Sequence, residues 1–265
     1  MDLFLGVVHN NDPKRMVSVA KTVDMVSSCF RDAGYSIEYG EASFQPDLSG
    51  RQRVEDVWRR VVYDIVVSEG ARVQGKNTKF LRLFFRIIRD SALWVKRARR
   101  DNRLAIQTAI TAKHLHLIET ALNSGAGLAI ILEDDAVVHK DSRKIFYSRV
   151  LPLLMEVDER PKWFLNLAGD SVETLTPGLN QLSMRLSDGV QAVFPAQVDT
   201  VCAYAIDRHA MDTLMKSVTL SPNLRNANMD HLLNRELPRM EAKAYHFLPG
   251  ALGHGSNVDM FSTWR

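Results

Sequence analysis

Three consecutive acids follow a run of apolar residues in the middle of the chain. The segment from Ala129 to Val138 reads AIILEDDAVV, so Glu133, Asp134 and Asp135 come at the end of an apolar strand. In open α/β sheets, ligands bind beyond the carboxyl ends of the strands. Neighbouring carboxylates repel one another unless cations or hydrogen-bond donors compensate, and their hard oxygens suit Mg²⁺ or Mn²⁺. The segment therefore predicts a divalent ion that holds a phosphate.

Side chains alternate along a strand, so only two of these acids are expected on the same side, where they could share the ion. Glu133 and Asp135 are expected on one side of the strand, and Asp134 on the other. We predict Asp135 as the direct metal ligand with Glu133 as the second, and Asp134 as a contact to the bound ligand. The alternative is that the acids cap the next helix or solvate a loop.

Expected strands alternate with expected helices, which predicts an α/β fold with a mixed, mostly parallel, Rossmann-like sheet and helices on both faces. The expected strands are 3–8, 35–40, 129–132, 162–170, 200–206 and 242–250. The expected helices are 15–30, 51–67, 105–125, 142–157, 207–218 and 228–237. The Asp188-Gly189 pair inside MRLSDGVQAVF predicts a hairpin at one edge of the sheet.

A strongly basic segment interrupts this alternation. Eleven Lys or Arg residues and two acids lie between Arg72 and Arg103, interleaved with Phe, Leu, Ile and Trp. We predict a single domain, 1–265, with an inserted basic helical segment at about 68–103. Such a helix is suited to a peripheral contact with an anionic membrane through 72–103, and an ordinary amphipathic helix packed on the sheet is the open alternative. The aromatic residues form no stacking platform, so no nucleic-acid partner is predicted.

Overall composition limits the class of protein. The 265 residues are 46% hydrophobic with a net charge of +3, enough apolar material for a sizeable core. Cys29 and Cys202 form no pair with metal-ligand spacing, so neither a disulfide framework nor a zinc knuckle is predicted. With no leader pattern and no apolar run of membrane-spanning length, we expect a cytoplasmic protein.

A second phosphate-binding motif offers an alternative function. GARVQGKN, from Gly70 to Asn77, approaches the P-loop pattern up to Lys76 but has Asn77 in place of the Mg²⁺-binding hydroxyl. The alternative is a P-loop-like phosphotransferase or NTPase that uses Gly70 to Lys76 together with the acidic strand end.

Several segments, in order, resemble glycosyltransferase family 25, whose members transfer sugars to lipopolysaccharide and lipooligosaccharide. TAKHLHLIETALNSGAGLAIILEDDAVV is similar to the family's helix and its strand ending in Glu-Asp-Asp. FLNLAGD, TVCAYAIDRHAMDTLM, NMDHLL and HGSNVDMFSTWR resemble later segments, so the likeness spans Leu104 to Arg265. Lys113 stands where the family usually has Ser.

The resemblance implies a GT-A fold and a metal-dependent hexosyltransferase. The implied donor is a nucleotide sugar, with UDP-galactose favoured, and the implied cofactor is Mn²⁺ or Mg²⁺. The implied acceptor is a hydroxyl of a cell-surface glycan precursor, which can be lipid-linked. Transfer would invert the anomeric centre, at the cytoplasmic face of the inner membrane.

Individual roles follow from the resemblance and from position. His254, in the tail, is expected as a further metal ligand, and Asp230 as the base that accepts the acceptor's proton. Asp230 could instead cap its helix, with Asp170 and Asp199 as fallback bases. The donor-binding residues are expected to be Asn10, Arg15, Asp134 and His114, although His114 also fits an apolar helix face. His246 is expected to be packed within its strand.

Overall fold

The structure, a computed structural model, describes residues 2–45, 103–157, 162–169, 183–187, 189–194, 196–198 and 200–255. Several predictions lie outside these residues. They are the helix at 51–67, the basic segment up to residue 102, the P-loop-like Gly70 to Lys76, and the fallback bases Asp170 and Asp199.

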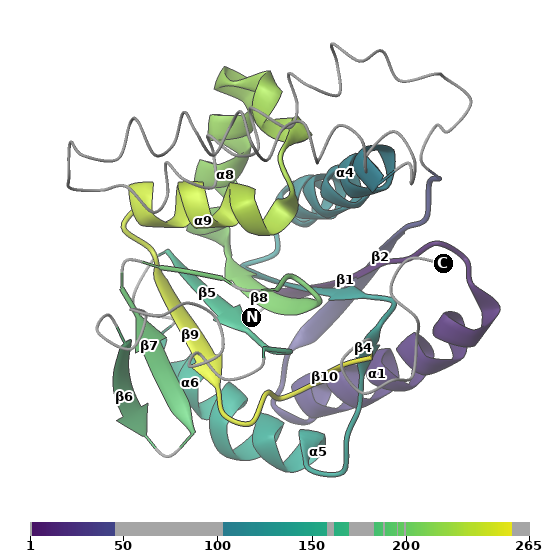
Figure 1. Cartoon of the computed structure of the whole chain (residues 1–265). Coiled ribbons are helices and arrows are strands. Elements are labelled where there is room, and N and C mark those ends of the chain that lie inside the picture. The colour runs from purple at the N-terminus through teal and green to yellow at the C-terminus, as the bar shows by residue number, and fades with distance from the viewer. Residues whose placement is uncertain are drawn as a thin grey trace, which may run out of the picture.

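An eight-stranded mixed sheet forms the centre of the described chain (Figure 1). Its strands, in spatial order, are β2 (Ser36–Ala42), β1 (Asp2–Val8), β3 (Leu128–Glu133), β8 (Ala203–Asp207), β5 (Trp163–Asn166), β9 (Lys243–Phe247), β7 (Val190–Val193) and β6 (Ser183–Ser187). The pairing directions make six strands run the same way, while β8 and β7 run opposite to them. The predicted mixed sheet is therefore confirmed.

Helices cover both faces of the sheet, as predicted (Figure 1). One face carries α4 (Arg103–Asn123), α8 (Arg208–Leu220), the 3₁₀ turn η4 (Pro222–Asn226) and α9 (Met229–Arg239). The other face carries α1 (Pro13–Asp32) and a helical stretch made of α5 (Ser142–Ile145), η2 (Phe146–Val150) and α6 (Leu151–Val157). None of the described helices is long and apolar enough to cross a membrane.

Between their end residues, β1 and β3 are apolar because both of their faces are covered by helices. Every residue of β1 after Asp2 is buried, and β3 is buried up to Leu132. Side chains that alternate along β3 enter two different hydrophobic cores: Ala129 and Ile131 face one layer of helices, and Ile130 and Leu132 the other. Charge can therefore appear on β3 only where the strand leaves the core, at Glu133.

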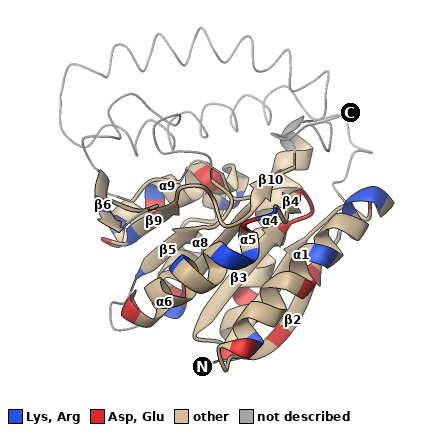
Figure 2. Ribbon diagram, turned by 90° about the horizontal axis from the view of Figure 1, so that it is seen from below, with Lys and Arg blue, Asp and Glu red and all other residues tan. Residues whose placement is uncertain are grey.

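The connections around β1 create a switch point in the sheet. From β1 the chain passes through α1 to β2 on one side, and it later returns through α4 to β3 on the other side of β1. Both neighbours are parallel to β1, so the carboxyl ends of β1 and β3 lie together. Ligands of such sheets bind at this point. Figure 2 shows the acidic turn after β3 in red, beside β4 (Ala136–Val137) and β10 (Gly253–His254).

His246 on β9 is packed within the sheet, as predicted. Its side chain is buried, and its Nε2 lies 2.9 Å from the carbonyl oxygen of Gln197. Burial lowers the pKa of His246 from its ordinary value of 6.5 to about 4. Between these two values the unfolded chain binds a proton that the folded chain does not. Stability is therefore lost as the pH falls through this window.

We expect the free energy of unfolding to fall by about 2 kcal/mol between about pH 7.5 and about pH 5 through His246 alone. His246→Gln keeps a hydrogen-bond donor but has no titrating group. Between the two pH values, the free energy of unfolding of this variant should therefore fall by about 2 kcal/mol less than that of the wild type. Urea unfolding at the two pH values measures the difference, with His116→Gln on the exposed face of α4 as control. Equal pH dependence of the wild type and His246→Gln would contradict the assignment.

Candidate functional site

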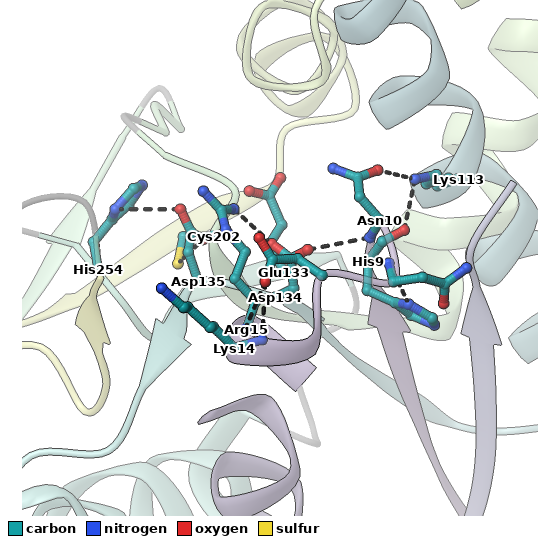
Figure 3. A network of polar contacts seen from close by, with 12 residues as sticks. His9, Asn10, Lys14, Arg15, Lys113, Glu133, Asp134, Asp135, Cys202 and His254 are labelled. Carbon is teal, nitrogen blue, oxygen red and sulfur yellow. Dashed lines mark hydrogen bonds and ion pairs between the residues drawn. The ribbon is translucent and has the colours of Figure 1, made fainter. Parts of the chain in front are cut away.

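The acidic turn begins where β3 ends. Glu133 is the last residue of β3, whereas Asp134 and Asp135 form a turn that leads into β4. Because the strand ends at Glu133, the alternation of side chains along β3 does not extend to Asp134 and Asp135. The prediction that Glu133 and Asp135 point to the same side of one strand therefore does not hold. Each carboxylate instead has protein partners of its own. Figure 3 shows those of Asp134 and Asp135.

Glu133 is held by a buried histidine. Its Oε1 lies 2.9 Å from Nε2 of His114, and Nδ1 of His114 lies 3.0 Å from the Tyr204 hydroxyl. A carboxylate only accepts hydrogen bonds, so Nε2 donates to Glu133 and Nδ1 can accept from the hydroxyl. His114 and Tyr204 are fully buried, and burial, with Glu133 close by, raises the pKa of Tyr204 well above its usual value. His114 is thus placed to orient Glu133. Because its side chain is fully buried, it is not placed to contact the nucleotide-sugar donor directly, contrary to the sequence prediction.

Tyr204→Phe should destabilise the protein by about 1–3 kcal/mol, because it leaves Nδ1 of the buried His114 without its partner. The substitution keeps the ring, which stacks on Phe164, so the expected loss comes from one hydroxyl. Thermal or urea unfolding measures it. The matched control is Tyr39→Phe at an exposed position, expected to change stability by less than about 0.5 kcal/mol. Equal effects at the two positions would show that the buried Tyr204 hydroxyl contributes no more to stability than an exposed one, which would contradict the prediction.

Asp134 joins the turn after β3 to the loop after β1. Its Oδ2 accepts from the backbone N–H of Asn10 at 3.1 Å, and its Oδ1 accepts from Nη1 of Arg15 at 2.8 Å. Burial opposes the charge on Arg15, but the hydrogen bond and charge of Asp134 outweigh it and raise the pKa of Arg15. Asn10, Arg15 and Asp134, all predicted to contact the donor, therefore lie together at the switch point.

Lys113 adds a buried positive charge to this group. Its Nζ donates to the carbonyl oxygen of His9 at 2.7 Å and to Oδ1 of Asn10 at 2.5 Å. Burial lowers the pKa of Lys113, and the nearby Asp134 and Glu133 oppose that shift. This side chain, which carried no role in the sequence analysis, fixes the loop after β1 against α4.

Asp135 forms the one cluster with metal-ligand chemistry found among the described residues. Its Oδ1 lies 3.2 Å from Sγ of Cys202, and its Oδ2 lies 3.6 Å from Nδ1 of His254. The three ligand atoms all lie within 4.8 Å of one another. Asp135 and Cys202 are buried, and His254 is partly exposed. Burial, followed by the charge of Asp135, raises the pKa of the Cys202 thiol well above its usual value.

Backbone pairing explains why these distant residues meet. β10 pairs with β4, which sets His254 opposite Ala136, and the N–H of Gly255 donates to the carbonyl oxygen of Asp135 at 2.7 Å. β8 runs antiparallel to β3, so the residue that precedes β8, Cys202, lies beside the end of β3. The predicted ligands Asp135 and His254 therefore come together. Glu133 is not in this cluster, because its carboxylate is held by His114.

Cys202 received no role in the sequence prediction because the other cysteine, Cys29, lies too far away along the chain to form a pair with metal-ligand spacing. Its partners in the structure, Asp135 and His254, are 67 and 52 residues away along the chain. The available signal was its position directly before an apolar strand. That signal becomes informative only when the strand is known to pair with β3 in the antiparallel direction.

Asp230 lies in the first turn of α9, on the same face of the sheet as α4. The residue at the N-cap is Asn228, so Asp230 does not cap this helix. Its Oδ2 lies 3.9 Å from Nε2 of His231, and its side chain is partly exposed. Asp230 thus keeps the exposure that a proton acceptor needs, and its role as the base stays a prediction.

Comparison with known proteins does not identify a family for this chain. No family model matches the chain, and no curated protein matches it significantly in sequence. The resemblance to glycosyltransferase family 25 therefore stays a prediction. The geometry at the ends of β1 and β3 is therefore the basis for proposing a function.

Proposed function

We propose that this chain is a metal-dependent glycosyltransferase of the GT-A type, which moves a sugar from a nucleotide sugar to an acceptor hydroxyl. The observation that carries the proposal is the meeting of Asp135 and His254 beside the switch point of the sheet. An oxygen and a nitrogen ligand, brought together from positions far apart in the sequence, fit a divalent ion at the place where such sheets bind nucleotides.

The proposed ion would be held by Asp135 and His254, with Mn²⁺ or Mg²⁺ as the first candidates. When bound, it supplies positive charge to the diphosphate that leaves as the sugar is transferred. His254 belongs to the last described strand, so binding of the ion would also fasten the tail of the chain to the acidic turn.

The residues at the end of β1 are proposed to bind the nucleotide. The side chain of Asp12 accepts from the N–H groups of Lys14 and Arg15, so the first turn of α1 is already capped. Recognition of phosphate is therefore assigned to the guanidinium group of Arg15, which Asp134 holds in place. Asn10 is held from two sides, by Asp134 and by Lys113, and offers a fixed amide to the nucleotide.

Asp230 is proposed as the base that accepts the acceptor's proton while the hydroxyl oxygen attacks the sugar. An inverting reaction needs one such carboxylate, and a partly exposed acid in the first turn of a helix can reach an acceptor. Galactose as the sugar, UDP as the nucleotide and a lipid-linked glycan as the acceptor depend on the family resemblance. Location at the inner membrane, with 72–103 on anionic lipid, belongs to the same proposal.

A thermal-shift screen of the full chain tests the proposal. We expect one nucleotide sugar to raise the melting temperature only when Mn²⁺, Mg²⁺ or Co²⁺ is also present, because ion and diphosphate bind as a unit. ATP serves as the comparison. The P-loop alternative predicts that ATP raises the melting temperature and that Lys76→Ala removes this increase. A response to ATP alone, with none to any nucleotide sugar, would overturn the transferase proposal.

A further inference from the structure

Cys202 lies beside both proposed metal ligands, and its sulfur bears on which ion the site prefers. We propose that Cys202 is a third direct ligand, so that Asp135, Cys202 and His254 bind a thiophilic divalent ion such as Zn²⁺ or Co²⁺ in preference to Mg²⁺. This inference rests on the proposed function for the place of the ion, and it replaces Mg²⁺ with a thiophilic ion as the preferred occupant.

The distances fit a small tetrahedral ion. Metal bonds of about 2.0–2.3 Å to oxygen, nitrogen and sulfur place neighbouring ligand atoms about 3.3–3.5 Å apart around such an ion. The sulfur of Cys202 lies 3.2 Å from Oδ1 of Asp135, and Nδ1 of His254 lies 3.6 Å from Oδ2 of the same residue. These two contacts use different oxygens of Asp135, and one ligand atom from each of the three residues lies within 4.8 Å of the other two, so side-chain rotations would be needed to gather them around one ion.

The ligands are held by backbone contacts between the segments that carry them. The N–H of Glu133 donates to the carbonyl oxygen of Cys202 at 2.7 Å, which fixes Cys202 against the acidic turn. On the other side, the N–H of Gly255 donates to the carbonyl oxygen of Asp135, also at 2.7 Å. The cluster is therefore built by the fold of the described residues and does not depend on flexible side chains alone.

The choice of ion follows from the sulfur. A thiolate is a soft ligand that suits Zn²⁺ and Co²⁺, whereas Mg²⁺ needs hard oxygen ligands in octahedral geometry. On binding, the Cys202 sulfur exchanges its proton for a bond to the ion, and the proton passes to solvent. Three protein ligands are typical of catalytic zinc sites, which keep a further position for water or substrate. The proposed function would place a phosphate oxygen of the donor there.

Cobalt spectroscopy of the full chain tests sulfur ligation without an activity assay. We expect Co²⁺ to give an intense sulfur-to-cobalt charge-transfer band in the near ultraviolet, unaffected by excess Mg²⁺. Cys202→Ser should abolish the band and weaken Co²⁺ binding about tenfold or more. Cys29→Ser is the matched control, because Cys29 is also a buried, free cysteine but belongs to the core beneath α1.

A second measurement covers the outcome in which Cys202→Ser does not fold. X-ray absorption of the zinc-loaded wild-type protein should show one sulfur at about 2.3 Å. A zinc shell of nitrogen and oxygen alone, or a cobalt spectrum identical in the wild type and Cys202→Ser, would overturn the inference. In either case, metal-dependent turnover that still requires Asp135 would leave the proposed function standing. Loss of that requirement would remove the proposed function independently.

Discussion

Replacing Asp135 with Asn is expected to lower the rate of metal-dependent sugar transfer or donor hydrolysis by a factor of about 100 or more. The substitution keeps the size of a buried side chain but removes the charge that faces His254. The proposed ion would lose its anionic oxygen ligand, and the departing diphosphate would lose its counter-charge. Release of nucleoside diphosphate at saturating Mn²⁺ measures the effect.

The control for this prediction is Asp141→Asn. Asp141 is an exposed acid six residues further along the chain, and its side chain makes no capping hydrogen bond to α5. It should leave turnover within about twofold of the wild type, because an exposed acid outside the cluster stabilises no charge in the reaction. Unchanged turnover in Asp135→Asn, with a normal melting temperature, would remove Asp135 from the ion site.

Arg15→Ala should lower the free energy of unfolding by roughly 2–3 kcal/mol. Removing one member of a buried ion pair leaves the other charge uncompensated, and the carboxylate of Asp134 is 6% exposed. The Arg15 side chain is 20% exposed, so the cost should be below the 3–5 kcal/mol or so of a fully buried pair. Unfolding in urea, with activity followed in parallel, measures both stability and the proposed role in phosphate binding.

A double-mutant cycle separates the pair from its surroundings. We expect Arg15→Ala combined with Asp134→Ala to be less destabilising than the sum of the two single variants, with a coupling energy of about 1–3 kcal/mol. Arg31→Ala, at an exposed position in the last turn of the same helix, should change stability by less than about 0.5 kcal/mol. Strict additivity of Arg15→Ala and Asp134→Ala would show that the contact stabilises nothing.

Elements with strong local signals could be predicted from the sequence. The helix now called α1 is bounded by Asp12, whose side chain caps it, and by Gly34, whose positive φ of 86° suits glycine. The expected hairpin is confirmed by the antiparallel pair of β6 and β7, with Gly189 at a φ of 76°. The stretch expected as one helix over 142–157 contains a π-helical turn, and Pro152, at the start of α6, has no N–H to continue regular α-helical bonding.

The site was only partly predictable from the sequence. The contacts of Asp135 with Cys202 and His254 depend on pairing between strands that are far apart in the chain. The acids were located correctly at the end of β3, but strand alternation failed where the strand ended at Glu133. The two-residue strands β4 and β10 are too short to leave a sequence pattern, although they place His254 beside Asp135. The buried charge of Lys113 was also unforeseen, since a lysine on a helix is usually exposed.

Calorimetric titration of the full chain with UDP, with and without Mn²⁺ or Co²⁺, tests the central claim most directly. The claim is that an ion held by Asp135 and His254 shares the diphosphate with the protein. We predict that UDP binds at least about tenfold more tightly when the ion is present, and that Asp135→Asn removes this difference. Equal UDP affinity with and without the ion, in a protein shown to be folded, would contradict the account.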